Sequence, residues 1–400
     1  MRGPALRVFR ARALTAPLLM AACLAVPAVA TAATATAATA ATPTAATAAT
    51  PTAATTPAAS AATPAPGRIA FFDYVTNQIY AANPDGTALT QLTHEPSGFS
   101  AQWPNWSADG THILFARINM STGMGRIWIM NADGTGQRKI ASDSPAWRDY
   151  EPKYTPDGKH IVFTRCPSDG PCAIWIMRSD GTRKHLVIPF LKKPTETNNF
   201  DPSVSPNGRH IAFDRFGFHG IVSQVWVADI SGRHAHPLTA PRLEAAEPTW
   251  SPDGNHISFT SNSSRAQSGI YVMRANGTAV TRLALTKWPT NNFGSAYAPS
   301  GSQIAFSSDR MHPDLCCEDL FVMDATGSHQ HLVVTGIQGA IEVAWGTAPL
   351  IAAGSPGTLS RLPSMGHASG NARSLRCVDE PPVITGGRCS VAAEMKHWRL

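Results

Sequence analysis

Short stretches of alternating apolar and polar residues recur along the middle of the chain, and each follows the same turn-forming tetrad. An aromatic residue or Val comes first, then Ser, Thr or Ala with Pro or Ala, then Asp, Asn or Ser with Gly, then an apolar alternation. The five copies are WSADGTHILF (106–115), YTPDGKHIVF (154–163), VSPNGRHIAF (204–213), WSPDGNHISF (250–259) and YAPSGSQIAF (297–306). Because Pro restricts φ and Gly tolerates positive φ, each tetrad predicts a tight turn between two strands.

The copies recur at a nearly constant period. Their first residues, which we name the anchors, are Trp106, Tyr154, Val204, Trp250 and Tyr297, spaced by 48, 50, 46 and 47 residues. A sixth anchor, Trp345, follows 48 residues later without the turn and the next strand, and the missing piece is at the other end, in GRIAFF (67–72). A period of this size is typical of repeat architectures.

Each period also contains a second apolar segment that ends in a hairpin signal. Examples are IWIMNADG (127–134), VWVADISG (225–232) and IYVMRANG (270–277). The Asp-Gly, Ser-Gly or Asn-Gly endings favour tight hairpins, and a fourth strand follows, ending in QLT or PLT in two of the repeats. Four short antiparallel strands per repeat are the pattern of a propeller blade.

The pattern predicts an all-β fold: a six-bladed β-propeller of four-stranded antiparallel blades over residues 67–347. Six second strands and six third strands are present. The first strand of the incomplete blade is expected from residues 341–345, and its other three from residues 67–93. Pairing the N- and C-terminal strands closes the ring, which removes open sheet edges.

The motifs P-x-W-S-P-D-G-x-x-I-x-F and I-W-V-M-x-x-D-G resemble the WD-like (PD40) repeats of the TolB propeller family, in all six units of residues 67–347. The resemblance covers only the propeller part of TolB, which has a small α/β domain before its propeller. It implies a docking surface for envelope proteins. Related propellers precede peptidase domains or act as pectin-fragment lyases, so the fold alone does not define the function.

Residues 1–30 are predicted to be a secretory signal peptide. Four arginines and no acid occupy residues 2–12, and an apolar run then ends in Ala-Val-Ala at Ala30. Two prolines interrupt the run, so we expect no membrane span in the mature chain. The chain is thus expected to be exported and extracellular or envelope-associated. Met20-Ala21-Ala22-Cys23 loosely resembles a lipoprotein box, and lipid anchoring through Cys23 is the alternative.

Two further segments lie outside the predicted propeller. Residues 31–66 consist almost only of Ala, Thr and Pro, and without large apolar residues they are predicted to form a disordered spacer. Residues 348–400 begin apolar and become rich in Ser, Gly and Arg, which favours a partly disordered tail.

The charge balance argues against nucleic-acid binding. The whole chain carries a formal net charge of +6, but ten of its 33 Lys and Arg residues lie in the leader and the tail. The predicted propeller keeps 23 basic against 24 acidic residues. A nearly neutral domain lacks the basic surface that a nucleic-acid partner requires.

Six of the seven cysteines remain after removal of the leader, and an even number in an exported chain permits disulfides. Cys166 and Cys172 are near enough in sequence to close one loop, and Cys377 and Cys389 could close another in the tail. Cys316 and Cys317 are adjacent, which leaves a vicinal bridge or two separate bridges open. The spacings match no usual zinc-ligand pattern.

The longer, more variable loops precede each anchor strand and follow each second strand, so they share one face. We name this the funnel face, and we expect binding there because binding residues concentrate on such loops. Its aromatic candidates for gripping a peptide or a sugar are Trp103, Tyr150, Phe200, Trp288 and Phe293. Packing of these side chains under neighbouring loops is the alternative.

One register position on the innermost strands is mostly acidic. The residues three before the anchors, which we name the axial ring, are Trp103, Glu151, Asp201, Glu247, Gly294 and Glu342. The four acids could bind a basic peptide group or, as metal candidates, a divalent cation in the central channel. The structural alternative is ion pairing between blades with Arg117, Arg165 and Arg215.

The sequence contains few residue patterns that are typical of catalytic sites. His112, His160, His210 and His256 share one register position on the opposite, short-turn face, where they are too far apart to share a metal. The funnel-side histidines are His94, His219 and His312, on separate loops. There is no G-x-S-x-G at a strand–turn–helix, no H-E-x-x-H and no P-loop.

We therefore expect a non-catalytic, monomeric propeller without a cofactor that binds an envelope or extracellular protein or peptide through its funnel face. The competing hypothesis is a carbohydrate- or metal-dependent enzyme of the lyase or hydrolase type, or a ligand sensor, that uses the same funnel.

Overall fold

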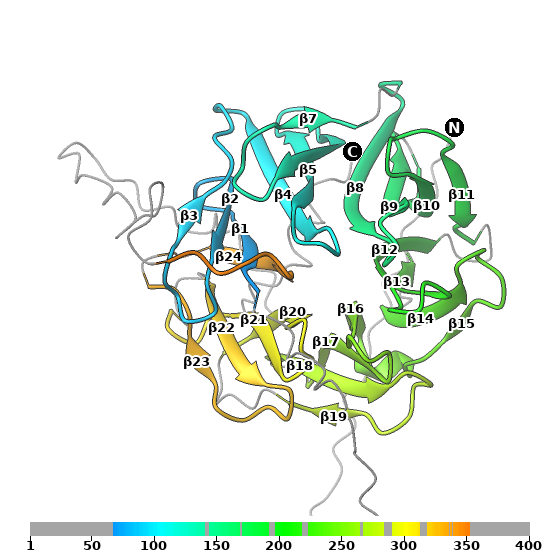
Figure 1. Ribbon diagram of the computed structural model, residues 1–400. Helices are drawn as coiled ribbons and strands as arrows, with labels where there is room; N and C mark the ends of the chain where they lie inside the picture. The colour runs from blue at the N-terminus through cyan, green and yellow to red at the C-terminus, as the bar shows by residue number, and fades with distance from the viewer. Residues whose placement is uncertain are drawn as a thin grey trace, which may run out of the picture. The chain divides into compact units, whose positions relative to one another are not determined.

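The computed structural model describes residues 67–352 except 141–143, 169, 192–196, 218–222, 265–266, 284–289, 313–317, 336 and 338. The predicted leader, spacer and most of the tail lie outside the described residues, as do Trp288, His219, Cys23, Cys316, Cys317, Cys377 and Cys389. Figure 1 shows the described strands arranged as sheets around a central axis.

Six four-stranded antiparallel sheets make up the described part, and they confirm the predicted propeller. Blade 1 is β24 (Ala340–Trp345), β1 (Ile69–Asp73), β2 (Gln78–Ala82) and β3 (Thr90–Gln91); blade 2 is β4 (Phe99–Trp106), β5 (His112–Asn119), β6 (Met124–Asn131) and β7 (Arg138–Lys139); blade 3 is β8 (Trp147–Tyr154), β9 (His160–Pro167), β10 (Ala173–Arg178) and β11 (His185–Ile188). Blade 4 is β12 (Thr197–Val204), β13 (His210–Gly217), β14 (Gln224–Asp229) and β15 (His236–Pro237); blade 5 is β16 (Ala245–Trp250), β17 (His256–Ser264), β18 (Gln267–Arg274) and β19 (Thr281–Arg282); blade 6 is β20 (Asn292–Tyr297), β21 (Gln303–Ser308), β22 (Asp319–Asp324) and β23 (His331–Leu332). A 3₁₀ turn, η1 (Pro241–Leu243), joins blades 4 and 5.

The repeated tetrads form the predicted turns between the first and second strands of a blade. In blade 5, Gly254 has φ +71° and donates its amide hydrogen to the carbonyl of Ser251 at 2.9 Å. The Asp253 carboxylate accepts a hydrogen bond from the amide of Asn255 at 3.0 Å, so it organises the turn. Asp253 and His256 are thus parts of a hairpin.

The core lies between neighbouring blades. The Phe that closes each repeated motif is fully buried in its blade, as Phe115, Phe163, Phe213, Phe259 and Phe306 show with 0% exposure. Between blades 1 and 2, Ile79 of β2 packs in one cluster with Ile113 and Phe115 of β5. Each blade buries its apolar face against the next, so the ring stabilises blades that are too thin to fold alone.

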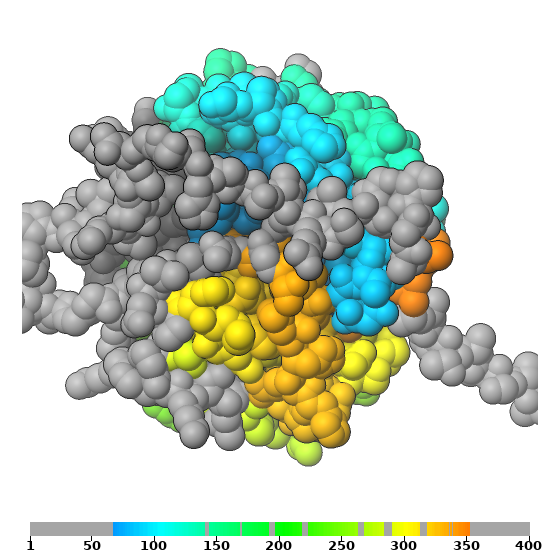
Figure 2. All heavy atoms as spheres, turned by 90° about the vertical axis from the view of Figure 1, so that its left-hand side faces the viewer, coloured from blue at the N-terminus to red at the C-terminus, as the bar shows by residue number. Residues whose placement is uncertain are grey.

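The two ends of the described chain meet in blade 1. Strand β24 pairs antiparallel with β1, with Ile69 opposite Trp345 and Phe72 opposite Ile341. The amide of Gly346 then donates to the carbonyl of Arg68 at 3.0 Å. Figure 2 shows yellow and orange atoms of late residues packed against blue atoms of early ones. The predicted closure by the terminal strands is confirmed.

No helix among the described residues is long and apolar enough to cross a membrane.

Candidate binding site at the propeller axis

The axial ring is a set of six β-bulges. All six residues have positive φ, from +45° at Gly294 to +55° at Glu247. Each lies where the register between the first and second strands of its blade shifts, for example between Tyr150 and Lys153 in blade 3. Because a bulge adds one residue to a strand, it turns the local backbone out of the ladder. In Figure 1 the bulged strands, β4, β8, β12, β16, β20 and β24, are nearest the centre.

Three glutamates of the ring bind the backbone of the next blade. Each carboxylate accepts a hydrogen bond from the amide of the following ring residue, and we name these contacts the inter-blade clips. They are Trp103 to Glu342 at 2.6 Å, Asp201 to Glu151 at 2.7 Å and Gly294 to Glu247 at 2.8 Å. The clips cross the boundaries of blades 1 and 2, 3 and 4, and 5 and 6. Non-glycine residues rarely adopt positive φ, and the clips help to hold them there.

A threonine supports two of the clips from the second strand of the same blade. Thr164 donates its hydroxyl to Glu151, and Thr260 donates to Glu247, each at 2.6 Å. In blade 4 the corresponding position is Asp214, one residue after the core Phe213. Blade 4 therefore places a second carboxylate where its neighbours place a hydroxyl donor.

Lys153 supplies a positive charge at the ring. It follows Glu151 by two residues on β8, and its side chain is half-buried. Burial lowers the pKa of Lys153, while the charges of Asp201, Glu151 and Glu342 act to raise it. These acids come from blades 4, 3 and 1, so the lysine faces several blades at once.

Burial also shifts the acids of blades 3 and 4. It raises the pKa of Glu151 to about 8, against the lowering effect of the hydrogen bonds from Thr164 and the amide of Asp201. Burial raises the pKa of Asp201, and the charges of Glu151 and Glu247 add to this rise. Burial, followed by the charge of Asp201, raises the pKa of Asp214 well above its usual range. Glu151, Asp201 and Asp214 therefore bind protons more tightly than exposed carboxylates do.

The expected pairing of ring acids with arginines is wrong. Arg165 forms a two-bond ion pair with Asp149, at 2.6 and 2.8 Å, and Arg215 donates to Asn199 at 2.7 Å. The reason is register, because Asp149 lies directly opposite Arg165 and Asn199 directly opposite Arg215.

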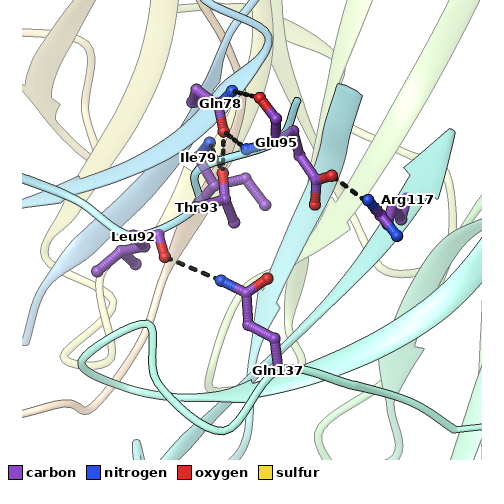
Figure 3. A network of polar contacts seen from close by, with 7 residues as sticks. All are labelled: Gln78, Ile79, Leu92, Thr93, Glu95, Arg117 and Gln137. Carbon is purple, nitrogen blue, oxygen red and sulfur yellow. Dashed lines mark hydrogen bonds and ion pairs between the residues drawn. The ribbon is translucent and has the colours of Figure 1, made fainter. Parts of the chain in front are cut away.

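The third arginine, Arg117, also pairs with an acid outside the axial ring. Arg117 pairs with Glu95 at 2.6 Å. Figure 3 shows that Glu95 also joins Gln78 and Thr93 in a network at the boundary of blades 1 and 2. These arginines stack on blade aromatics as well, such as Arg215 over Trp226 at 4.4 Å. They are structural residues.

The predicted aromatic residues are partly packed. Trp103 and Tyr150 form an edge-to-face pair with ring centroids 5.5 Å apart, and the Tyr150 hydroxyl donates to the carbonyl of Gly123 at 2.5 Å. Phe200 stacks on Phe216 at 5.4 Å. Phe293 is buried, at 6% exposure, whereas Trp103, Tyr150 and Phe200 are half-buried.

The histidines are distributed over separate blades. His112, His160 and His210 are half-buried and His256 is exposed, each at the start of a second strand. On the funnel side, His312 lies 3.6 Å from Asp319, and His94 contacts Gln91 at 3.1 Å. Within the described ranges, no three His, Cys, Asp or Glu residues are grouped so that they could hold a metal ion.

Comparisons with known proteins agree with the repeat pattern. Residues 173–345 match the family described as TolB beta propeller domain. A 100-residue stretch is 33% identical to the Tol-Pal system protein TolB of Anaeromyxobacter dehalogenans (strain 2CP-C). The described domain is a TolB-like propeller. The aligned stretch covers 25% of this chain and 21% of that relative.

Solved TolB structures share the fold of this TolB-like propeller. TolB from Acinetobacter baumannii superposes with a TM-score of 0.56 at 18% identity, over 70% of this chain and 66% of that one. The putative TolB from Agrobacterium tumefaciens gives 0.54 at 21% identity, over 71% of this chain and 93% of that one. At these identities the likeness concerns the fold.

Proposed function

We propose that this chain is an exported, envelope-associated or extracellular propeller that binds a protein or peptide partner without catalysis. The observation that carries the proposal is the axial ring, where Asp201, Glu247 and Glu342 stay partly exposed beside the half-buried Trp103. Partly exposed carboxylates are suited to recognition of a basic group, because a charge-assisted hydrogen bond is strong. The TolB-like fold, and the naming of one relative as a Tol-Pal system protein, support an envelope role.

The local chemistry of the ring also supports binding. The carboxylates of Glu151 and Glu247 are occupied by amide and hydroxyl donors, which fix their positions. A recognition site benefits from such fixed acceptors, because less freedom is lost when a partner binds.

Site-specific photo-cross-linking tests this function. A benzoylphenylalanine at Trp103 reports on the axial ring, and one at the exposed turn residue Lys159 serves as the matched control on the other face. Incubation with envelope and secreted fractions of the source organism should yield a discrete adduct from position 103 and none from 159. Adducts only from position 159, or none from either, would contradict the proposal. A stoichiometric divalent ion in the purified protein would favour the metal-dependent alternative.

A further inference from the structure

Asp201 differs from the glutamates of the axial ring. Its shorter side chain makes no clip, and no hydrogen bond to its carboxylate is found among the described residues. Its backbone amide, by contrast, is held by Glu151 at 2.7 Å. The residue is therefore fixed in place while its charged group remains available at the partly exposed ring.

Asp214 lies beside Asp201 and is also incompletely paired. Its side chain is 2% exposed, and its Oδ1 has no hydrogen-bond partner in the structure. Its Oδ2 accepts one bond, from the hydroxyl of Ser223 at 3.2 Å. Asp214 occupies the position from which Thr164 and Thr260 contact the ring glutamates, so it points toward Asp201.

Negative charge exceeds positive charge around this pair. Asp201 faces the charges of Glu151, Glu247 and Lys153, and Asp214 faces those of Asp201 and Glu247. Lys153 is thus the one cation that acts on either aspartate within the described residues. Buried carboxylates without partners are costly, and they are stabilised by donors that carry positive charge.

We propose that Asp201 and Asp214 form a socket for a basic side chain, Lys or Arg, of the partner. This inference rests on the proposed function, because the partner supplies the cation. The incoming group reaches Asp201 at the ring and lies beside Lys153, whose own ammonium already faces the same acids. Asp214 lies behind Asp201 and adds its charge.

A nitrogen cation fits this socket better than a metal ion does. Calcium requires six to eight oxygen ligands and magnesium a near-octahedral set. The described acids do not form such a group. N–H donors need only acceptors in suitable directions, and the Asp201 carboxylate offers two oxygens without a hydrogen-bond donor among the described residues.

Protons and the ligand compete for this socket. Burial raises the pKa of both aspartates, so each holds its proton to a higher pH than an exposed carboxylate does. A cation binds the ionised pair and releases the proton. We therefore expect the affinity to increase as pH rises.

The socket is tested on the full chain with n-butylammonium chloride as the probe, titrated by calorimetry, and with 1-butanol as the uncharged control. We expect saturable butylammonium binding that weakens about tenfold or more in Asp201→Asn, because a charge-assisted hydrogen bond is lost, and in Asp214→Asn, because a neighbouring negative charge is lost. The control variant Asp157→Asn removes an exposed turn acid of blade 3 and should bind like the wild type. Thermal melts serve to check that each variant is folded.

Three results would overturn the socket: no saturable butylammonium binding, equal binding by Asp201→Asn/Asp214→Asn, or preferential calcium binding in a parallel titration. The cross-linking experiment separates this outcome from failure of the proposed function. A partner that cross-links at position 103 with unchanged affinity for the double variant would refute the socket alone. Butylammonium binding that depends on the aspartates, without any partner adduct, would refute the partner-binding function.

Discussion

The carboxylate of Glu247 accepts a hydrogen bond from the backbone amide of Gly294, 2.8 Å away, across the boundary between blades 5 and 6. The same relation holds between Glu151 and Asp201 and between Glu342 and Trp103. Every second blade boundary is therefore joined near the axis by one carboxylate. The remaining boundaries begin at Trp103, Asp201 and Gly294. Trp103 and Gly294 carry no charge, and the Asp201 side chain is too short to make this contact.

Removal of one clip should destabilise the propeller measurably. Glu247→Ala leaves the amide of Gly294 and the hydroxyl of Thr260 without their carboxylate acceptor, and we expect the free energy of unfolding to fall by about 2–3 kcal/mol. Glu247→Gln keeps an oxygen acceptor of the same length and should lose less than half as much. Urea denaturation at neutral pH measures both. Equal losses in the two variants would show that the clip is not the stabilising contact.

Stability should depend on pH through Glu151. Its pKa is raised from 4.5 to about 8, so between these values the folded state binds the proton more tightly than the unfolded state does. Stability is then fully present below pH 4.5 and declines as pH rises toward 8. Each unit of pKa difference corresponds to about 1.4 kcal/mol.

The measurement compares wild type with Glu151→Gln, which does not titrate but can still accept the hydrogen bonds. We expect the wild type to lose at least about 1–2 kcal/mol relative to the variant between pH 5 and pH 8. Asp201 and Asp214 titrate in both proteins, so the difference reports Glu151 together with the effect of its charge on the pKa of Asp201. A constant difference across this range would contradict the raised pKa.

The fold could be predicted from the sequence because its signals are local and repeated. Neighbouring residues and their spacing are enough to locate the anchors, the turn tetrads and the paired ends at Ile69 and Trp345. The register of the axial ring was found in the same way. The functional roles of Trp103, Tyr150, Phe200, Phe293 and the ring acids remain predictions that the experiments above address.

The partners of the ring acids were missed for a physical reason. Glu151, Glu247 and Glu342 bind backbone amides. Nearly every residue type has a backbone amide, so the sequence does not show which one a carboxylate contacts. The bulge at each ring position also shifts the register by one residue, which hid the direct pairing of Asp149 with Arg165.

The unusual acid at position 214 could have been recognised from the sequence. Aligning the residues that follow the second-strand Phe shows Ala116, Thr164, Asp214, Thr260 and Ser307, and the aspartate is the one acid in this set.

The ion pair of Asp149 and Arg165 should be strongly coupled. Their side chains are only 3% and 5% exposed, so Arg165→Ala leaves a buried carboxylate without its main partner, and we expect a loss of about 3–5 kcal/mol. Arg165→Lys should recover little, because it lacks the two-bond geometry and the stacking on Trp147 and Trp175. A double-mutant cycle with Asp149→Asn, followed by urea denaturation, measures the coupling. Additive losses would exclude a direct interaction.

The predicted bridge between Cys166 and Cys172 is present, and it should tie blade 3 to blade 4. The amide of Cys172 donates to the Asn198 side chain at 2.8 Å, and the carbonyl of Cys172 accepts from the amide of Asn199 at 3.1 Å. The bridged residues are six apart, and closing so short a loop stabilises by about 2 kcal/mol. Cys166→Ser/Cys172→Ser should therefore lower the free energy of unfolding by about this amount.

The same variant should also change local motion at the blade boundary. Without the bridge, the segment that contacts blade 4 through Cys172 is less constrained. Hydrogen exchange of the backbone amides at position 172 and at Asn199 should therefore accelerate. The amide of Gly294, at the distant boundary of blades 5 and 6, serves as the reference. Dithiothreitol should reproduce the effect in the wild type and add nothing to the variant. Acceleration at both boundaries alike would indicate global destabilisation, and unchanged exchange at Asn199 would show that the bridge does not hold the two blades together.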